Sequence, residues 1–197
     1  MKVGLFFGSF NPIHIGHLII ANHFQQFSDL EQVWFVVSPQ NPFKEKKSLA
    51  NEYNRLEMVE LAIQDYPNLR ACSDEFHLPR PSYTIDTLTH LKEKYPRYDF
   101  SLIMGSDVLI SLPKWKNADI LLRDYSMYVY PRPGEILADF DAKITIVEAP
   151  LMEISSTFIR NAVKHNKNIK PMLPPKVWEY LDGSNLYKYC LLYTSPS

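Results

Sequence analysis

The chain has 197 residues, of which 46% are hydrophobic and 22% charged, and its formal net charge is −1. This length and composition indicate one globular domain with a sizeable core. The balanced charge argues against a broad surface for nucleic acid or anionic lipid, although a local anion pocket needs only a few groups.

Two further absences narrow the class of protein. The two cysteines, Cys72 and Cys190, fit neither a disulfide framework nor a zinc ribbon. No apolar run reaches the length of about 18 residues that a membrane span needs, and the first residues lack the pattern of a cleaved signal. We therefore expect a cytoplasmic protein that binds neither membrane nor nucleic acid.

Short apolar runs and helical patterns alternate along the chain. Strands are predicted at 2–7, 32–38, 69–72, 99–104, 126–130 and 143–147, and helices from about residue 15 and at 51–65, 84–95, 117–123, 155–164 and 174–181. The helix over 51–65 is expected to bury Leu56, Val59, Leu61, Ala62 and Ile63. This alternation predicts an α/β, Rossmann-like parallel sheet with helices on both faces and a small C-terminal helical part.

Residues 1–188 are predicted to form a single domain. The tail 189–197 continues no element, so we interpret it as an extension or a non-native scar. Ligands of such sheets bind beyond the carboxyl ends of the strands, where the strand order reverses. The first strand runs into Gly8 and the middle strand into Gly105, and polar residues follow both. The site is expected there.

The junction after the first strand has the features of an anion site. Gly8 permits close approach of the backbone to a ligand, and the next helix presents its N-terminal N–H groups to the turn. His14 and His17 are three residues apart and share a helical face. They are suited to donating hydrogen bonds to phosphate oxygens. The alternatives are half of a metal site and incidental residues at a helix start.

Two segments carry a resemblance to a known superfamily. The stretch from Gly8 to His17, GSFNPIHIGH, closely resembles the T/SxxxxHxGH signature of nucleotidyltransferases, which include adenylyltransferases and class I aminoacyl-tRNA synthetases. The stretch 154–160, ISSTFIR, resembles the segment whose serine, threonine and arginine hold the ATP phosphates. Its residue types suit that role, because hydroxyls can cap a helix and Arg160 offers a forked donor. Alone, a Ser-Ser-Thr run is often only a helix cap.

Further segments are similar to the nicotinate-nucleotide adenylyltransferases, over residues 1 to about 187. They are RLEM at 55–58, PSYT at 81–84, GSD at 105–107, PKWK at 113–116, RPG at 132–134 and LY at 186–187. The resemblance implies catalytic roles for His14, His17 and Arg160. It implies an ATP site of Gly8, Ser9, Phe10, His14, His17, Gly105, Asp107, Ser156, Thr157 and Arg160, and an acceptor site of Asn11, Lys44, Tyr83, Thr84, Trp115, Lys116 and Arg132.

Several of these residues have simpler interpretations. Trp115 can cover a core edge, Tyr83 and Thr84 can simply start a helix, Asp107 can cap one, and the lysines near Lys44 can form a solvated loop. The chain also departs from the usual pattern. Asn11 stands where the family usually has an acid, and Phe43 replaces a histidine, so the roles of that acid and that histidine are not carried over.

The resemblance implies adenylyl transfer from ATP to nicotinate mononucleotide, giving nicotinate adenine dinucleotide and pyrophosphate. Magnesium is expected to arrive with ATP, and no metal site of the protein itself is predicted. The alternatives are nicotinamide mononucleotide or phosphopantetheine as acceptor, and a non-catalytic nucleotide-binding regulatory module. A tRNA-linked enzyme is disfavoured by the balanced charge and the short chain. The sequence leaves the oligomeric state open, a homo-oligomer included.

Overall fold

A computed structural model describes residues 1–39, 49–132, 143–150 and 152–188. Its strands are β1 (Lys2–Gly8), β2 (Gln32–Val37), β3 (Leu69–Cys72), β4 (Asp99–Gly105), β5 (Met127–Tyr130) and β6 (Ile144–Ile146). Its α-helices are α1 (Ile15–Phe27), α2 (Glu52–Ile63), α3 (Thr84–Lys94), α4 (Ser106–Ser111), α5 (Ala118–Asp124), α6 (Ser156–Lys164) and α7 (Pro175–Asp182). Short 3₁₀ helices are η2 (Asp74–His77), η3 (Leu112–Lys114) and η4 (Lys170–Met172).

The strands form one parallel sheet in the order β3-β2-β1-β4-β5-β6. Strands β2 and β3 follow one another on one side of β1, and β4, β5 and β6 follow one another on its other side. The order therefore reverses between β1 and β4, which are paired through Lys2 to Phe6. The predicted α/β class and parallel sheet are confirmed, and β1 and β4 end together at Gly8 and Gly105.

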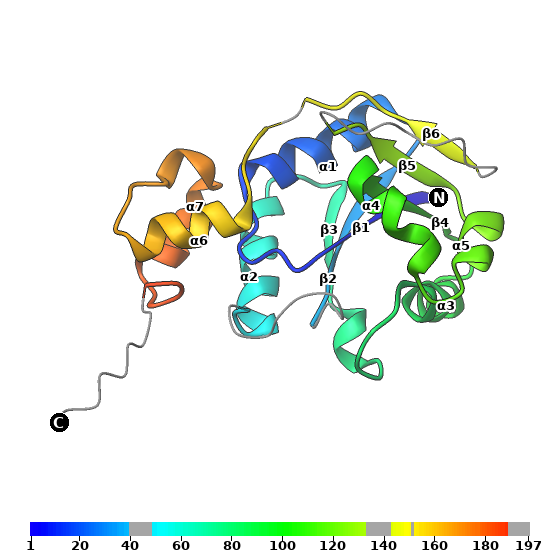
Figure 1. The fold of residues 1–197 in the computed structure, drawn as a ribbon, viewed down its shortest axis with the longest axis horizontal. Helices are drawn as coiled ribbons and strands as arrows, with labels where there is room; N and C mark the ends of the chain where they lie inside the picture. Colours follow the sequence, from blue (N-terminus) through cyan, green and yellow to red (C-terminus); the bar gives the residue numbers. More distant parts are fainter. Residues whose placement is uncertain (40–48, 133–142, 151, 189–197) are drawn as a thin grey trace.

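Alternating side chains divide the core into two layers, one on each face of the sheet. On β2, Val33, Phe35 and Val37 join the layer under α1 and α2, whereas Trp34 and Val36 join the layer under α3, α4 and α5. This is the period of two that a strand imposes, and a parallel strand covered on both faces is apolar throughout. Figure 1 shows the sheet between these helices.

The C-terminal helical part lies beside α2, as Figure 1 shows in orange. Ile159 of α6 and Val177 and Leu181 of α7 are buried in the same apolar cluster as Met58 and Val59 of α2. This packing brings α6 to the end of β1, although the two segments are far apart in sequence. The predicted small C-terminal helical part is therefore joined to the main core.

Two sequence predictions need correction. The helix α4 was not predicted, because six residues are too few to display a helical period before Pro113. The predicted inner face of α2 was also wrong in part, since Leu56 and Leu61 are only partly buried. Arg55 and Met58 are buried in their place, and an analysis of apolar positions does not select an arginine for the interior.

Among the residues that the structure describes, no helix is long and apolar enough to cross a membrane. Lys44, Phe43 and the tail 189–197 lie outside the described residues, so the predictions that concern them stay predictions.

Candidate active site

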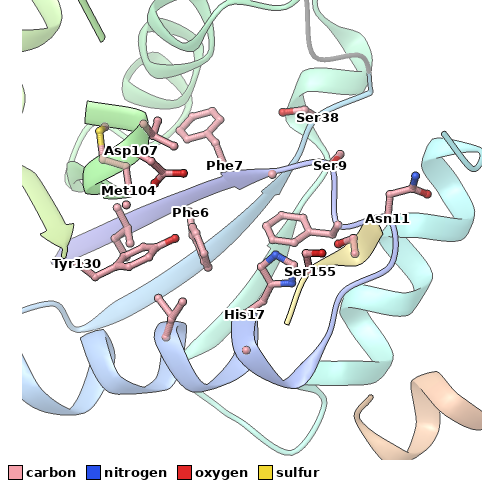
Figure 2. Close-up of a pocket in the computed structure, with 18 of the residues that line it drawn as sticks. Phe6, Phe7, Ser9, Asn11, His17, Ser38, Met104, Asp107, Tyr130 and Ser155 are labelled. Carbon is pink, nitrogen blue, oxygen red and sulfur yellow. The ribbon is translucent and has the colours of Figure 1, made fainter. Parts of the chain in front are cut away.

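A cavity of about 920 Å³ lies at the carboxyl ends of β1 and β4. Its volume is within the range of about 300–1,000 Å³ that is usual for small-molecule pockets. The described residues predicted for the site all line it: Gly8, Ser9, Phe10, Asn11, His14, His17, Tyr83, Thr84, Gly105, Asp107, Trp115, Lys116, Arg132, Ser156, Thr157 and Arg160. Figure 2 shows His17, Asn11 and Ser155 near one end of this region, with Asp107 and Tyr130 toward the other.

The two histidines lie against each other at the start of α1. Their rings stack with centroids 3.7 Å apart and an interplanar angle of 26°. The backbone N–H of His14 donates to Nδ1 of His17 at 3.3 Å, so a neutral His17 ring carries its proton on Nε2. Gly16 leaves room for this pair, because a Cβ at that position would approach His14 Nδ1 to 3.1 Å.

The surroundings of the His14 ring favour its neutral form. The residue is only 5% exposed, and burial, assisted by the charge of Arg132, lowers its pKa to about 4. Within the described part of the chain, His14 Nδ1 is buried without a hydrogen-bond partner, and such a buried polar atom calls for an explanation. A stacked pair with at least one neutral ring avoids two like charges in contact.

A metal site is not supported by the surroundings of this pair. In the ranges that the structure describes, no three or more His, Cys, Asp or Glu side chains are grouped so that they could hold a metal ion. The interpretation of His14 and His17 as half of a metal site therefore lacks the remaining ligands there. Their position at the N-terminus of a 13-residue helix instead favours an anion.

The Phe10 ring packs against the His17 ring. The Phe10 side chain is 2% exposed, and its ring centroid lies 5.2 Å from that of His17 and 5.3 Å from that of Phe35. Its φ of 43° places a non-glycine residue in the left-handed region, which costs free energy and persists only where packing holds it. A contact of Phe10 with ATP would therefore use its backbone rather than its ring.

Helix α6 holds the turn between β1 and α1. The Ser156 hydroxyl donates to the carbonyl of Pro12 at 2.9 Å, and Nη1 of Arg160 donates to the carbonyl of Asn11 at 2.8 Å. The helix-cap interpretation is correct for Ser155, whose Oγ accepts from the Phe158 N–H at 3.1 Å. The segment thus has a structural role at the turn in addition to any role toward phosphate.

Asn11 is buried, with 3% exposure. Its Oδ1 accepts hydrogen bonds from the hydroxyl of Tyr187 at 2.6 Å and from the N–H of Ala50 at 3.1 Å. The side chain therefore links the turn to the last described segment and to the residue just before α2. Both of these partners belong to the protein, and the amide oxygen of Asn11 accepts the two hydrogen bonds without carrying a charge.

The segment before α3 and the end of η3 form another part of the cavity wall. Tyr83 is the N-cap residue of α3 and makes no capping hydrogen bond through its side chain. The Nζ of Lys116 lies 4.8 Å from the Tyr83 ring centroid and pairs with Asp86 Oδ2 at 2.8 Å. Trp115 lines the cavity and also packs against the apolar layer under α3, so it does cover a core edge, while its role toward a substrate stays a prediction.

The end of β4 carries an ion pair. Nε of Arg132 lies 3.2 Å from Oδ1 of Asp107, and both side chains are about half exposed. The backbone N–H of Arg132 donates to the Ser106 hydroxyl at 2.8 Å. Gly105 makes room for this arrangement, because a Cβ there would lie 2.4 Å from Asp107 Oδ1. A carboxylate and a guanidinium are thus presented together at the end of β4.

Sequence reasoning missed two buried charged residues: Glu75, which lines the cavity, and Arg55, which binds the backbone of the cavity residue Ser9. The Arg55 side chain donates to the backbone carbonyls of Ser9, Ser38, Pro39 and Ala50 at 2.6–3.0 Å. It ties the ends of β1 and β2 to the residue before α2. The family-like segment at 55–58 pointed to this arginine, but only the tertiary structure shows that it is buried.

A parallel sheet with a helix N-terminus at its switch point is typical of nucleotide-binding α/β proteins. Residues 5–162 match a family described as cytidylyltransferase-like. Proteins from Flavobacterium johnsoniae and Flavobacterium psychrophilum, each described as a probable nicotinate-nucleotide adenylyltransferase, are 55% and 57% identical over 192 residues. These alignments cover 95% of this chain and 100% of each relative.

A solved structure shares the fold. It is the nicotinic acid mononucleotide adenylyltransferase of Plasmodium falciparum, in complex with NaAD, with a TM-score of 0.79 and 21% sequence identity. The superposition covers 96% of this chain and 98% of that one. The chain therefore belongs to the cytidylyltransferase-like family and, within it, to the nicotinate-nucleotide adenylyltransferases.

Proposed function

We propose that this protein transfers the adenylyl group of ATP to nicotinate mononucleotide, forming nicotinate adenine dinucleotide and releasing pyrophosphate. The observation that carries the proposal is the stacked His14–His17 pair at the N-terminus of α1, facing the same cavity as Tyr83 and Trp115. A phosphate site and an aromatic site in one cavity suit a nucleotide and a second, ring-bearing substrate. The names of the Flavobacterium relatives support the same reaction.

In this proposal the 5′-phosphate of the mononucleotide attacks the α-phosphorus of ATP in line. The phosphate oxygen forms the new P–O bond while the bond to the β-phosphate breaks, and pyrophosphate leaves. The attacking phosphate is largely ionised at neutral pH, since its second pKa is about 6. It therefore needs no general base, and no covalent enzyme intermediate is required. Catalysis consists of positioning and of stabilising the charge that moves to the leaving group.

His17 is the principal donor in this scheme. Its Nδ1 accepts the His14 N–H, so the ring presents Nε2–H as a donor without needing a net charge. His14, Ser9 and the backbone after Gly8 complete the phosphate contacts. Arg160 keeps the turn in place through Asn11, and its five N–H donors allow it to bind a phosphate oxygen as well.

The acceptor and the nucleoside occupy the remaining walls. The Trp115 ring stacks on the pyridine, and N–H groups near Thr84 and Lys116 receive the carboxylate, since the N-terminus of α3 lacks a side-chain cap. Asp107 and Gly105 lie along the adenosine, where the carboxylate accepts from ribose hydroxyls. Lys44 is assigned to phosphate, and Arg132 to the mononucleotide, on the resemblance of their positions.

ATP enters with magnesium, which is held mainly by phosphate oxygens and water. Asp107 is a carboxylate of the cavity that can contact such an ion through water, although it is paired with Arg132. The metal is therefore part of the substrate. A reducing cytoplasm remains the proposed location, in keeping with the free, buried Cys72.

The test is a pyrophosphate-release assay with ATP and each candidate acceptor in turn. Nicotinate mononucleotide should give the highest kcat/KM. Activity with phosphopantetheine alone would refute the acceptor assignment, and preference for nicotinamide mononucleotide would refute the role given to the carboxylate. Binding of ATP without release for any acceptor would favour a regulatory module.

A further inference from the structure

A buried carboxylate lies behind the wall that carries Tyr83 and Thr84. Glu75, in η2, is 2% exposed. Its Oε2 accepts from the Ser82 hydroxyl at 3.1 Å, and its Oε1 accepts from the Thr87 hydroxyl at 2.8 Å. The two oxygens thus hold the residue just before the Tyr83–Thr84 pair and a residue in the first part of α3.

The same carboxylate reaches a third segment. Burial raises the pKa of the Glu75 carboxyl, and the nearby Ser38, just after β2, opposes this rise together with Thr87 and Ser82. Glu75 and Ser38 both line the cavity. A buried polar network of this kind fixes geometry when all its members are satisfied. Here it fixes the N-terminus of α3 against the sheet.

Helix α3 has a second carboxylate attachment that lies away from the cavity. Asp74, the neighbour of Glu75 in η2, binds His90 at 3.1 Å and Lys94 at 2.5 Å. These partners belong to the C-terminal half of α3, and none of the three residues is among those that line the cavity. The chain therefore offers a matched pair of carboxylates, one at each end of the same helix.

We propose that Glu75 is a positioning residue for the acceptor: by holding Ser82 and Thr87, it fixes the Tyr83–Thr84 backbone that receives the pyridine carboxylate. This inference rests on the proposed function, because it assumes that the acceptor lies against α3. In the proposed function the ATP phosphates lie at α1 and α6 and the adenosine lies along Gly105 and Asp107, and none of these segments makes the hydrogen bonds to Glu75. Loss of Glu75 should therefore weaken the acceptor site and spare the ATP site.

The test compares Glu75→Met, which keeps the approximate length without an acceptor, with Glu75→Gln, which keeps one acceptor oxygen. KM for each substrate and kcat are measured in the pyrophosphate-release assay. Glu75→Met should raise KM for nicotinate mononucleotide about tenfold, as expected for losing hydrogen bonds to a buried charged group, with KM for ATP changed less than about twofold. Glu75→Gln should raise KM for nicotinate mononucleotide much less than Glu75→Met does. Asp74→Asn should leave both KM values unchanged.

If Glu75→Met does not fold, Thr87→Val carries the test, because it preserves the shape of the side chain and removes the hydroxyl that donates to Glu75 Oε1 at 2.8 Å and, within α3, contacts the Tyr83 carbonyl at 3.3 Å. Its control is Thr89→Val, since the Thr89 hydroxyl bonds only within α3, to Ile85, among the contacts of the described chain. Thr87→Val should raise KM for the acceptor about threefold, and Thr89→Val should not.

Equal increases in both KM values, or an equal effect of Asp74→Asn, would overturn the positioning role while the proposed function stands. A wild-type protein without activity toward nicotinate mononucleotide would refute the proposed function. If the wild-type protein used another acceptor, the changes in KM for that acceptor and for ATP would be compared in the same way to decide the role of Glu75.

Discussion

Acidification should destabilise this protein through His14. In the folded state burial lowers the pKa of His14 to about 4, whereas the unfolded chain regains the ordinary value of 6.5. Between these two pH values the unfolded state binds more protons than the folded state. The free energy of unfolding therefore falls as pH drops through this window and is fully retained above it.

The size of the effect follows from the two pKa values. Linkage gives a loss of about 2 kcal/mol between about pH 7 and pH 5, and about 3 kcal/mol once the folded state is also protonated. The measurement is urea unfolding followed by tryptophan fluorescence at several pH values. The carboxyl groups also titrate, so His14→Asn serves as the reference, and the difference between wild type and variant isolates His14.

The wild-type protein should lose more stability than His14→Asn on acidification, by the amount given above. Identical pH dependence of the two proteins would show that His14 is not held neutral. The folded-state pKa of His14 would then lie near the ordinary 6.5 rather than near 4, and the argument that burial keeps this ring neutral on acidification would fail.

Three substitutions test the remaining assignments. His17→Ala should lower kcat about 10²–10³-fold, with little effect on mononucleotide binding, because its hydrogen bond strengthens in the transition state; near-normal turnover would remove His17 from the catalytic role. Trp115→Ala should raise KM for the mononucleotide more than KM for ATP, and equal increases would exclude it from the pyridine pocket. Arg55→Met should lower the free energy of unfolding in urea by about 3 kcal/mol or more, since four backbone carbonyls lose a buried donor. A loss below about 1 kcal/mol would contradict the structural role of Arg55.

The sequence predicted the frame of the fold because strand and helix patterns are local. β2 reads as a continuous apolar run since both of its faces are covered, and α1 begins at Ile15, where the turn ends. The end of β3 matches the prediction to the residue, whereas α2 stops at Ile63 rather than near 65, which is the usual uncertainty at helix ends. Helix α4 was missed because it is a single short stretch without a repeating pattern.

The residue types of the candidate site were also readable in the sequence, because the motifs at 8–17 and 154–160 are contiguous. What these residues contact could not be read. Ser156 and Arg160 bind the carbonyls of Pro12 and Asn11, which are more than a hundred positions away in the chain. Such pairings depend on where α6 packs, and that is set by the shared core with α2 rather than by the motif.

The sequence alone thus predicted the parallel α/β sheet, and it predicted residues that line one cavity at the ends of β1 and β4. Only the tertiary structure decided which polar side chains hold the site together. Arg55 and Glu75 are buried, contrary to the usual exposure of charged residues, because backbone carbonyls and hydroxyls from distant segments converge on them. Burial likewise lowers the pKa of His14. That shift depends on how much water the folded core excludes, which a local pattern of residues does not show.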